Sequence, residues 1–210
     1  MKKSISILGS TGSIGLSTLE IIDKKKNFFN INLLSANKNY NLICNQIKKY
    51  KPIYYVVSDK KTYDKIKNKF KRKKTKILNK FNYIKCKKSH HITVSAIPGI
   101  AGLHPTLEMI KLSDKILLAN KESIICGWNL INLNAKKNKT EIIPIDSEHF
   151  SISKLLKNQD LKDVEKIFIT ASGGPFLNYK KNQFKNITPE KAIKHPKWKM
   201  GKKISIDSST

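Results

Sequence analysis

Short apolar runs alternate along the chain with segments in which apolar residues recur every three or four positions. Continuous apolar runs are typical of strands buried on both faces, and the longer spacing is typical of helices. The pattern predicts strands at residues 4–8, 31–35, 53–57, 92–97, 115–119 and 141–143. It predicts helices at residues 16–22, 42–50, 103–112 and from about 123 to 137. Strands that alternate with helices predict a mostly parallel, doubly wound α/β sheet covered on both faces.

The rhythm changes after residue 148. Residues 164–171 are predicted to form a strand, Pro189 to begin a helix, and residues 203–206 to form a last short strand. The lysine-rich residues 60–80 are predicted to form a surface helix followed by a loop. We therefore expect a first domain over residues 1–145 and a second over residues 146–210.

Composition places the chain among globular proteins. Its 210 residues, 39 % of them hydrophobic, are sufficient for a sizeable core. It has no apolar run of 18 residues, and residues 1–8 are interpreted as a strand rather than a leader, so we expect a soluble, cytoplasmic protein. Cys44, Cys86 and Cys126 are isolated in the sequence, which fits a reducing compartment without disulfides.

The formal net charge of +27 raises the question of nucleic-acid binding. Arg72 is the only arginine, although arginine is the favoured reader of phosphates and guanine edges. The lysines are spread along the whole chain, with one dense run at residues 69–74. We interpret the excess as drift towards A/T-rich codons, which balanced base composition in the coding DNA would contradict.

Gly9, Gly12 and Gly15 lie between the first predicted strand and the first predicted helix. Glycines let the backbone approach a pyrophosphate closely, and the N–H groups at a helix start bind it. The spacing departs from G-x-G-x-x-G, so a plain glycine turn is the alternative. Its place between strand and helix favours a Rossmann-like domain that binds a dinucleotide.

The second predicted strand leads into residues 36–39, Ala-Asn-Lys-Asn. NAD-specific domains usually carry a carboxylate there, which binds the ribose 2′-hydroxyl. Here no carboxylate would repel a 2′-phosphate, and Lys38 could pair with one. The sequence therefore favours NADP over NAD, although Lys38 is also one lysine among many.

Asp146 and Glu148 follow the strand predicted at residues 141–143. Residues two apart along a strand point to the same side, so both carboxylates are expected to reach one space. Oxygen ligands suit Mg²⁺ or Mn²⁺ rather than zinc. The alternative is a solvated turn or a helix N-terminus, where Asp, Ser and Glu are common. Since they follow parallel strands, residues 9–13, 37–39, 120–122 and 146–148 should line one edge of the sheet.

Two loops in the second domain are further candidates. Residues 172–176, Ser-Gly-Gly-Pro-Phe, combine a hydroxyl with open backbone N–H groups and could bind a phosphate. His195, Trp198 and Met200 lie in the segment 195–201, which contains Pro196 and ends at Gly201, and could form a lid that excludes water. An ordinary loop with a buried tryptophan is the alternative.

Five segments occur in this order: residues 9–15, 118–123, 146–149, 172–176 and 195–201. Together they closely resemble the 1-deoxy-D-xylulose 5-phosphate reductoisomerase family, from about residue 4 to the end. The resemblance implies NADPH- and Mg²⁺- or Mn²⁺-dependent conversion of this sugar phosphate to 2-C-methyl-D-erythritol 4-phosphate, in non-mevalonate isoprenoid synthesis. It implies a homodimer for the full-length family. The distribution of basic residues and the lack of a long apolar run predict no specific nucleic-acid partner and no membrane partner. Residues 146–210 would then be the start of an α+β catalytic domain.

The resemblance also implies roles for individual residues. Catalytic roles fall to Lys121, Glu148 and His195, and the metal ligands are Asp146 and Glu148. Contacts with NADPH fall to Thr11, Gly12, Ser13, Ile14, Asn37, Lys38, Asn39, Asn120, Glu122 and Gly201. Contacts with the substrate fall to Lys121, Ser147, Glu148, Ser172, His195 and Ser208. Trp198 and Met200 match the lid.

One departure from the family concerns the end of the chain. In the family, the segment ending at Ser208 continues into a run with an Asn-Lys pair and a third metal carboxylate, whereas this sequence stops first. We expect these 210 residues to bind NADPH weakly and to turn over little. Three alternatives stay open: another NADP-dependent dehydrogenase, which a chelator would not inhibit; a basic nucleic-acid-binding module, with salt-sensitive oligonucleotide affinity; and a decayed, inactive remnant of the enzyme.

Overall fold

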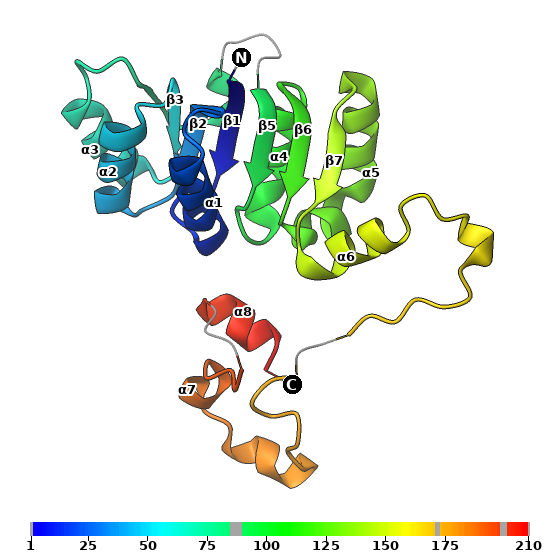
Figure 1. Ribbon diagram of the computed structural model, residues 1–210. Helices are drawn as coiled ribbons and strands as arrows, with labels where there is room; N and C mark the ends of the chain where they lie inside the picture. Colours follow the sequence, from blue (N-terminus) through cyan, green and yellow to red (C-terminus); the bar gives the residue numbers. More distant parts are fainter. Residues whose placement is uncertain (1, 85–89, 171–172, 198–200, 210) are drawn as a thin grey trace. The chain divides into compact units, whose positions relative to one another are not determined.

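The computed structural model describes residues 2–84, 90–170, 173–197 and 201–209 (Figure 1). The chain divides into two compact units, Met1–Leu155 and Leu156–Thr210. No helix in the described ranges is long and apolar enough to cross a membrane.

The first unit is built on a seven-stranded sheet in the order β4-β3-β2-β1-β5-β6-β7, and every neighbouring pair is parallel. The strands are β1 (Lys3–Leu8), β2 (Phe29–Ala36), β3 (Tyr54–Val57), β4 (Lys76–Leu78), β5 (His90–Ser95), β6 (Ser113–Leu118) and β7 (Glu141–Pro144). The chain moves outward from β1 in one direction through β4, then returns to β5 and moves outward in the other direction. This is the doubly wound arrangement that the alternation of strands and helices predicts.

Helices cover both faces of the sheet. They are α1 (Ser13–Lys24), α2 (Tyr40–Tyr50), α3 (Lys60–Lys69), α4 (Leu103–Ile110), α5 (Lys121–Asn138) and α6 (Ser147–Leu155), with short 3₁₀ turns η1 (Phe81–Tyr83) and η2 (Ile100–Gly102). Successive strand residues point to opposite faces, so Leu34 packs in one core cluster with α1, α2 and α3, while Leu33 packs in a second with α4 and α5. Both leucines are fully buried.

The prediction for residues 60–80 missed one strand. The helix is present as α3, but the predicted loop contains β4, whose Lys76 pairs with Tyr54 of β3. An edge strand of three residues among lysines leaves too short a pattern to identify from sequence. The other six strands predicted for this unit are present.

The second unit contains η3 (Leu161–Asp163), η4 (Lys181–Asn186), α7 (Pro189–Ala192) and α8 (Lys202–Asp207). Helix α7 begins as predicted, with Pro189 in its first turn and the Thr188 hydroxyl accepting from the Lys191 N–H. The strand predicted near residues 203–206 is wrong, because this segment is helical. The alternation Ile204-Ser205-Ile206 is too short to distinguish a strand from a helix.

The strand predicted at residues 164–171 is also wrong over the described residues, since 164–170 have no regular structure. Phe168 is 82 % exposed and Ile169 is 71 % exposed. A strand requires a neighbour for its backbone N–H and C=O groups, and no strand occurs among the described residues of the second unit. The segment contains the apolar residues on which the prediction was based, but the described residues of this unit include no strand with which it could pair. Ala171 lies outside the described residues.

Candidate functional site at the carboxyl edge of the sheet

The glycine-rich turn between β1 and α1 is shaped by close backbone contacts. Gly9 has φ +79°, and a Cβ there would lie 2.8 Å from the carbonyl oxygen of Ala96. A Cβ on Gly15, in the first turn of α1, would lie 2.3 Å from the carbonyl oxygen of Gly9. Gly12 caps α1 without a side chain of its own, and its N–H donates to the Gly9 carbonyl at 3.0 Å. The turn therefore presents bare backbone and a helix N-terminus, which suits a phosphate group.

Exposure along this turn agrees with a ligand-facing surface. Thr11 is half-buried, whereas Gly12, Ser13 and Ile14 are exposed. All four are predicted contacts of NADPH. The residues of the turn that are buried instead, Ser10 and Gly15, hold it against the rest of the domain.

The loop after β2 carries Asn37, Lys38 and Asn39, all exposed. The side chain of Asn39 accepts from the Leu42 N–H at 3.2 Å and so caps α2. Hydrogen bonds from Thr62 and, to a smaller extent, the positive charge of Lys38 lower the pKa of the Asp59 carboxyl. Lys38 therefore lies in electrostatic reach of one carboxylate, and a 2′-phosphate bound there would share this cation with Asp59.

Asn120, a predicted contact of the cofactor, is buried, and its side-chain amide is hydrogen-bonded to other residues of the protein. Its Nδ2 donates to the carbonyls of Ile97 and Gly99, and its Oδ1 accepts from the Ser123 N–H at 2.9 Å as the cap of α5. Gly102 leaves room for it, because a Cβ there would lie 2.1 Å from Asn120 Nδ2. Asn120 thus fixes the start of α5, where Lys121 is exposed and Glu122 is half-buried.

The acidic pair after β7 is arranged differently from the prediction. The strand ends at Pro144 and α6 begins at Ser147, so Asp146 and Glu148 do not share one face of a strand. Asp146 instead stands before the helix, where it accepts from the His149 N–H at 3.2 Å and lies 2.6 Å from His149 Nδ1. The helix N-terminus considered as the alternative is thus the local structure.

The charges of Lys121 and Asp146 nevertheless act on the Glu148 carboxyl, so the three predicted residues lie near one another. The hydroxyl of Ser147 donates to Glu148 at 2.7 Å, and this bond is the main reason that the pKa of Glu148 is lowered. Lys121 lowers the same pKa and Asp146 raises it, so both charges act on Glu148. Two carboxylates and a lysine therefore share one neighbourhood after β6 and β7.

This donor set fits a hard divalent cation. No group of three or more His, Cys, Asp or Glu side chains able to hold a metal occurs among the described residues. Asp146 and Glu148 supply oxygen only, and Mg²⁺ is commonly held by one or two carboxylates together with water and substrate oxygens. The glycine turn likewise fits a dinucleotide, because the Gly9 and Gly15 positions admit no Cβ.

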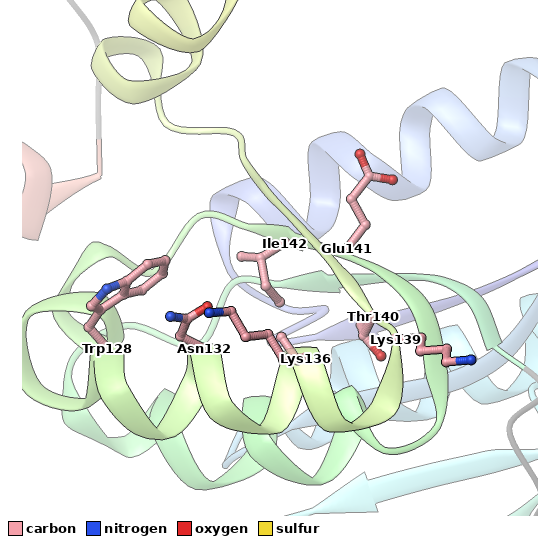
Figure 2. A pocket seen from close by; sticks show the side chains of 8 residues that line it. Trp128, Asn132, Lys136, Lys139, Thr140, Glu141 and Ile142 are labelled. Carbon is pink, nitrogen blue, oxygen red and sulfur yellow. The ribbon is translucent and has the colours of Figure 1, made fainter.

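The parallel register sets these loops at one edge of the sheet (Figure 1). Leu8 pairs with Ser95, Ser95 with Leu118, and Leu118 with Pro144. Residues 9–13, 120–122 and 146–148 follow these strand ends directly, and residues 37–39 follow β2 beside β1. A separate hollow lies between α5 and β7, lined by Trp128, Asn132, Lys136 and neighbours (Figure 2). It is built around the start of β7, whereas the acidic pair follows its end.

In the second unit, the predicted phosphate loop meets the end of the chain. Gly173 has φ +65°, and a Cβ on Gly174 would lie 2.1 Å from the carbonyl oxygen of Ser208. The Phe176 N–H donates to the Ser209 carbonyl at 3.0 Å. This loop and Ser208, both predicted to bind the substrate, are thus in contact.

For the remaining predicted residues that are described, the structure shows their exposure and one hydrogen bond. His195 is half-buried, and its Nδ1 accepts from the Lys197 N–H at 3.2 Å. Gly201 is exposed. Ser172, Trp198 and Met200 lie outside the described residues.

Sequence reasoning missed a buried polar cluster beneath the glycine turn. It consists of Ser10, Ser35, Gln46 and Tyr55, all at most 4 % exposed. Gln46 lies beside Ile43 and Ile47 on the buried face of α2. A glutamine at that position of an apolar helical pattern was the available signal.

Comparisons with known proteins identify the family that the chain resembles. The family model 1-deoxy-D-xylulose 5-phosphate reductoisomerase matches residues 5–127, and the model of that family's C-terminal domain matches residues 142–210. Reductoisomerases of this name from Pelagibacter ubique and Clostridium novyi are 47 % and 46 % identical, over 99 % of this chain and 55 % of each relative.

Solved structures give the same result. A crystal structure of DOX-P reductoisomerase in complex with NADPH, fosmidomycin and magnesium has a TM-score of 0.88 and 34 % identity, over 99 % of this chain and 54 % of that one. The Zymomonas mobilis enzyme in complex with NADPH has a TM-score of 0.85 and 31 % identity, over 100 % of this chain and 54 % of that one. The chain spans about half the length of the relatives that it matches. It belongs to the 1-deoxy-D-xylulose 5-phosphate reductoisomerase family.

Proposed function

We propose that this chain contributes to the NADPH- and divalent-metal-dependent conversion of 1-deoxy-D-xylulose 5-phosphate to 2-C-methyl-D-erythritol 4-phosphate, in non-mevalonate isoprenoid synthesis. One observation carries the proposal. In a member of this family, the glycine turn, the Lys38 loop and the group formed by Lys121, Asp146 and Glu148 all follow strand ends at one edge of a single sheet. A cofactor and a metal bound at that edge would be neighbours.

Binding of NADPH is assigned to two stretches of the chain and to three further residues. Residues 11–14 would hold the pyrophosphate region through backbone N–H groups at the start of α1. Residues 37–39 would meet the adenosine ribose, with Lys38 pairing with the 2′-phosphate. Asn120, Glu122 and Gly201 are further contacts, and NADPH when bound supplies the hydride that reduces the rearranged substrate.

Asp146 and Glu148 would hold Mg²⁺, with Mn²⁺ as the alternative. When bound, the ion supplies a Lewis acid for the carbonyl and the neighbouring hydroxyl of the substrate. Lys121 adds a fixed positive charge near the oxygen on which negative charge develops. The Ser147 hydroxyl holds the Glu148 carboxylate in its charged form, as the lowered pKa of Glu148 indicates.

The second unit is assigned to the rest of the substrate. Ser172 and Ser208 would contact the phosphate end, a role supported for Ser208 by the close approach of Gly174 to its carbonyl. His195 would contact the reacting end, and Trp198 and Met200 would close over it and exclude water.

Several finer statements belong to the same proposal. The boundary between a cofactor domain, residues 1–145, and a catalytic domain, residues 146–210, is supported by the end of β7 at Pro144 and by the C-terminal family match from residue 142. The compact units divide later, after Leu155, since α6 packs against β7. A homodimer for the full-length family, a cytoplasmic location and the absence of a nucleic-acid partner also remain predictions.

Binding measurements test the proposal most directly, because they report on the cofactor site and the metal site separately. Titration calorimetry should show NADPH binding at least tenfold tighter than NADH. Addition of Mg²⁺ should strengthen binding of 1-deoxy-D-xylulose 5-phosphate, and EDTA should reverse the effect. Asp146→Asn should abolish the Mg²⁺ effect, whereas Asp64→Asn, on the exposed surface of α3, should preserve it. Equal affinity for the two cofactors together with Mg²⁺-independent substrate binding would overturn the proposal.

A further inference from the structure

Four polar side chains are buried directly beneath the glycine turn. They come from four elements: Ser10 from the turn itself, Ser35 from β2, Gln46 from α2 and Tyr55 from β3. Ser10 and Tyr55 are 0 % exposed, Ser35 is 1 % exposed and Gln46 is 4 % exposed. Buried polar groups destabilise a fold unless each is hydrogen-bonded, so the pairing within this cluster decides what it does.

Gln46 forms two hydrogen bonds with Ser10. The Ser10 hydroxyl donates to Gln46 Oε1 at 2.7 Å, and Gln46 Nε2 donates to the Ser10 carbonyl at 2.9 Å. The Tyr55 hydroxyl donates to the same Oε1 at 2.6 Å and lies 3.2 Å from the Ser10 hydroxyl. The side-chain amide is thus fixed by Tyr55 and in turn fixes both the hydroxyl and the backbone of Ser10.

Ser35 holds the same turn from the neighbouring strand. Its carbonyl accepts from the Ser10 N–H at 2.7 Å, and its hydroxyl accepts from the Gly9 N–H at 3.0 Å. The N–H groups of Gly9 and Ser10 are therefore hydrogen-bonded within the buried cluster, as are the carbonyl and the hydroxyl of Ser10. The residues that follow, Gly12, Ser13 and Ile14, are exposed and can face a ligand.

Helix α2 connects this cluster to the second cofactor loop. It starts at Tyr40, immediately after residues 37–39, and carries Gln46 within its second turn. A shift of α2 would therefore move the Lys38 loop together with Gln46, which is hydrogen-bonded to Ser10. Conversely, loss of the Gln46 contacts would remove two of the hydrogen bonds that position Ser10, leave those to Ser35, and remove no group proposed to contact the 2′-phosphate.

We infer that Gln46 and Tyr55 are positioning residues, which hold the pyrophosphate-binding turn at a fixed distance from the loop that binds the 2′-phosphate. They touch no cofactor atom themselves and act through Ser10. A dinucleotide must span both sites at once, so a rigid spacing lowers the entropy lost on binding. The inference rests on the proposed function for the identity of the cofactor, NADPH.

The test compares NADPH with 2′-AMP, a fragment that carries the 2′-phosphate but no pyrophosphate. Dissociation constants are measured by titration calorimetry or NMR for the 210-residue chain, for Tyr55→Phe and for Gln46→Leu. Both variants should raise the Kd for NADPH by about three- to tenfold and leave the Kd for 2′-AMP within about twofold. Tyr55→Phe keeps the aromatic ring and loses only the hydroxyl, so it maintains the test if Gln46→Leu fails to fold.

Thr140→Val is the matched control. Thr140 is buried, and its hydroxyl donates to the carbonyls of Ile110 and Ser113, beside the amino-terminal ends of β6 and β7. This variant should lower the melting temperature without changing either Kd. If the cluster variants also lower the melting temperature with both Kd values unchanged, or weaken both ligands equally, the cluster only packs the core and the inference is refuted. Failure of the proposed function would appear separately, as equal affinity of the unmodified chain for NADPH and NADH.

Discussion

The stability of the first unit should depend on the charge of one buried histidine. His90 starts β5, is 1 % exposed, and its Nδ1 is hydrogen-bonded to the Ser6 hydroxyl of β1. Burial lowers the pKa of His90 from its ordinary value of 6.5 to about 4, because a charged imidazole would lose its hydration there. The perturbation to examine is therefore protonation of His90.

The sign follows from comparing the folded and unfolded chains. Above pH 6.5 the imidazole is neutral in both states, and its contribution to stability is fully present. Between pH 6.5 and pH 4 the unfolded chain binds a proton that the folded chain does not, so stability falls as the pH falls. One pKa unit corresponds to about 1.4 kcal/mol, so the total loss through this window amounts to about 3 kcal/mol.

Urea unfolding at half-unit steps from pH 7.5 to pH 4 measures this loss. His90→Gln removes the titration, so the stability difference between it and the unmodified chain should shrink by about 3 kcal/mol across the window. Ser6→Ala removes the hydrogen bond but leaves the imidazole buried, so it should retain the full pH dependence. The hydrogen bond from Lys49 lowers the pKa of Asp23 below 3.8, so that carboxyl acts at more acidic pH. Parallel curves for the unmodified chain and His90→Gln would refute the reasoning.

Three further perturbations have defined outcomes. Gly15→Ala should lower the melting temperature by up to about 8 °C, because its Cβ would lie 2.3 Å from the Gly9 carbonyl oxygen. Overpacking of this kind costs about 1–3 kcal/mol, and alanine gains about 1 kcal/mol in a helix, which leaves a net cost of up to about 2 kcal/mol. Scanning calorimetry checks it, and an unchanged melting temperature would show that the turn yields. Lys38→Ala should weaken NADPH about tenfold and leave NADH unchanged in parallel titrations, since only NADPH carries the 2′-phosphate. Equal weakening of both would place Lys38 elsewhere on the cofactor. Asn120→Ala should lower the free energy of unfolding, measured with urea, by about 2–4 kcal/mol, because it leaves buried carbonyls unpaired and removes the cap of α5. A loss below about 0.5 kcal/mol, roughly that of an ordinary surface substitution, would contradict that role.

Hydrophobic patterning predicted the first unit well because strands such as β1 and β3 are buried on both faces. A parallel sheet imposes runs such as residues 4–8 and 115–119, which few other structures require. The same pattern failed at residues 164–170, where an apolar run has no neighbouring strand among the described residues of its unit. A strand is stabilised by its neighbours, so composition alone does not decide it.

Residue types at the site were easier to predict than their geometry. Asp146 and Glu148 follow β7 as expected, but the start of α6 at Ser147 replaces the strand on which their shared direction was argued. The N-terminal signal was present, since Asp146 stands three residues before His149, whose N–H it accepts. Gln46 was missed because a single polar residue among apolar ones gives no indication of its partner, which lies 36 positions away in the sequence.

Position in the fold, rather than abundance, distinguishes the two lysines proposed to act at the site from the other basic residues. Of 42 basic residues, Lys38 and Lys121 are marked by following β2 and β6 at the carboxyl edge of the sheet, where each acts on the pKa of a nearby carboxyl. By contrast, Lys60 and Lys69 are solvated and lie over the rings of Tyr63 and Tyr40, which requires no ligand. Replacing Lys60 or Lys69 removes a surface ion pair or hydrogen bond together with one charge, whereas replacing Lys38 or Lys121 removes a charge from the edge of the sheet where the cofactor and the metal are proposed to bind. A strongly basic composition is therefore compatible with a site that depends on two lysines, and it does not by itself indicate a nucleic-acid partner.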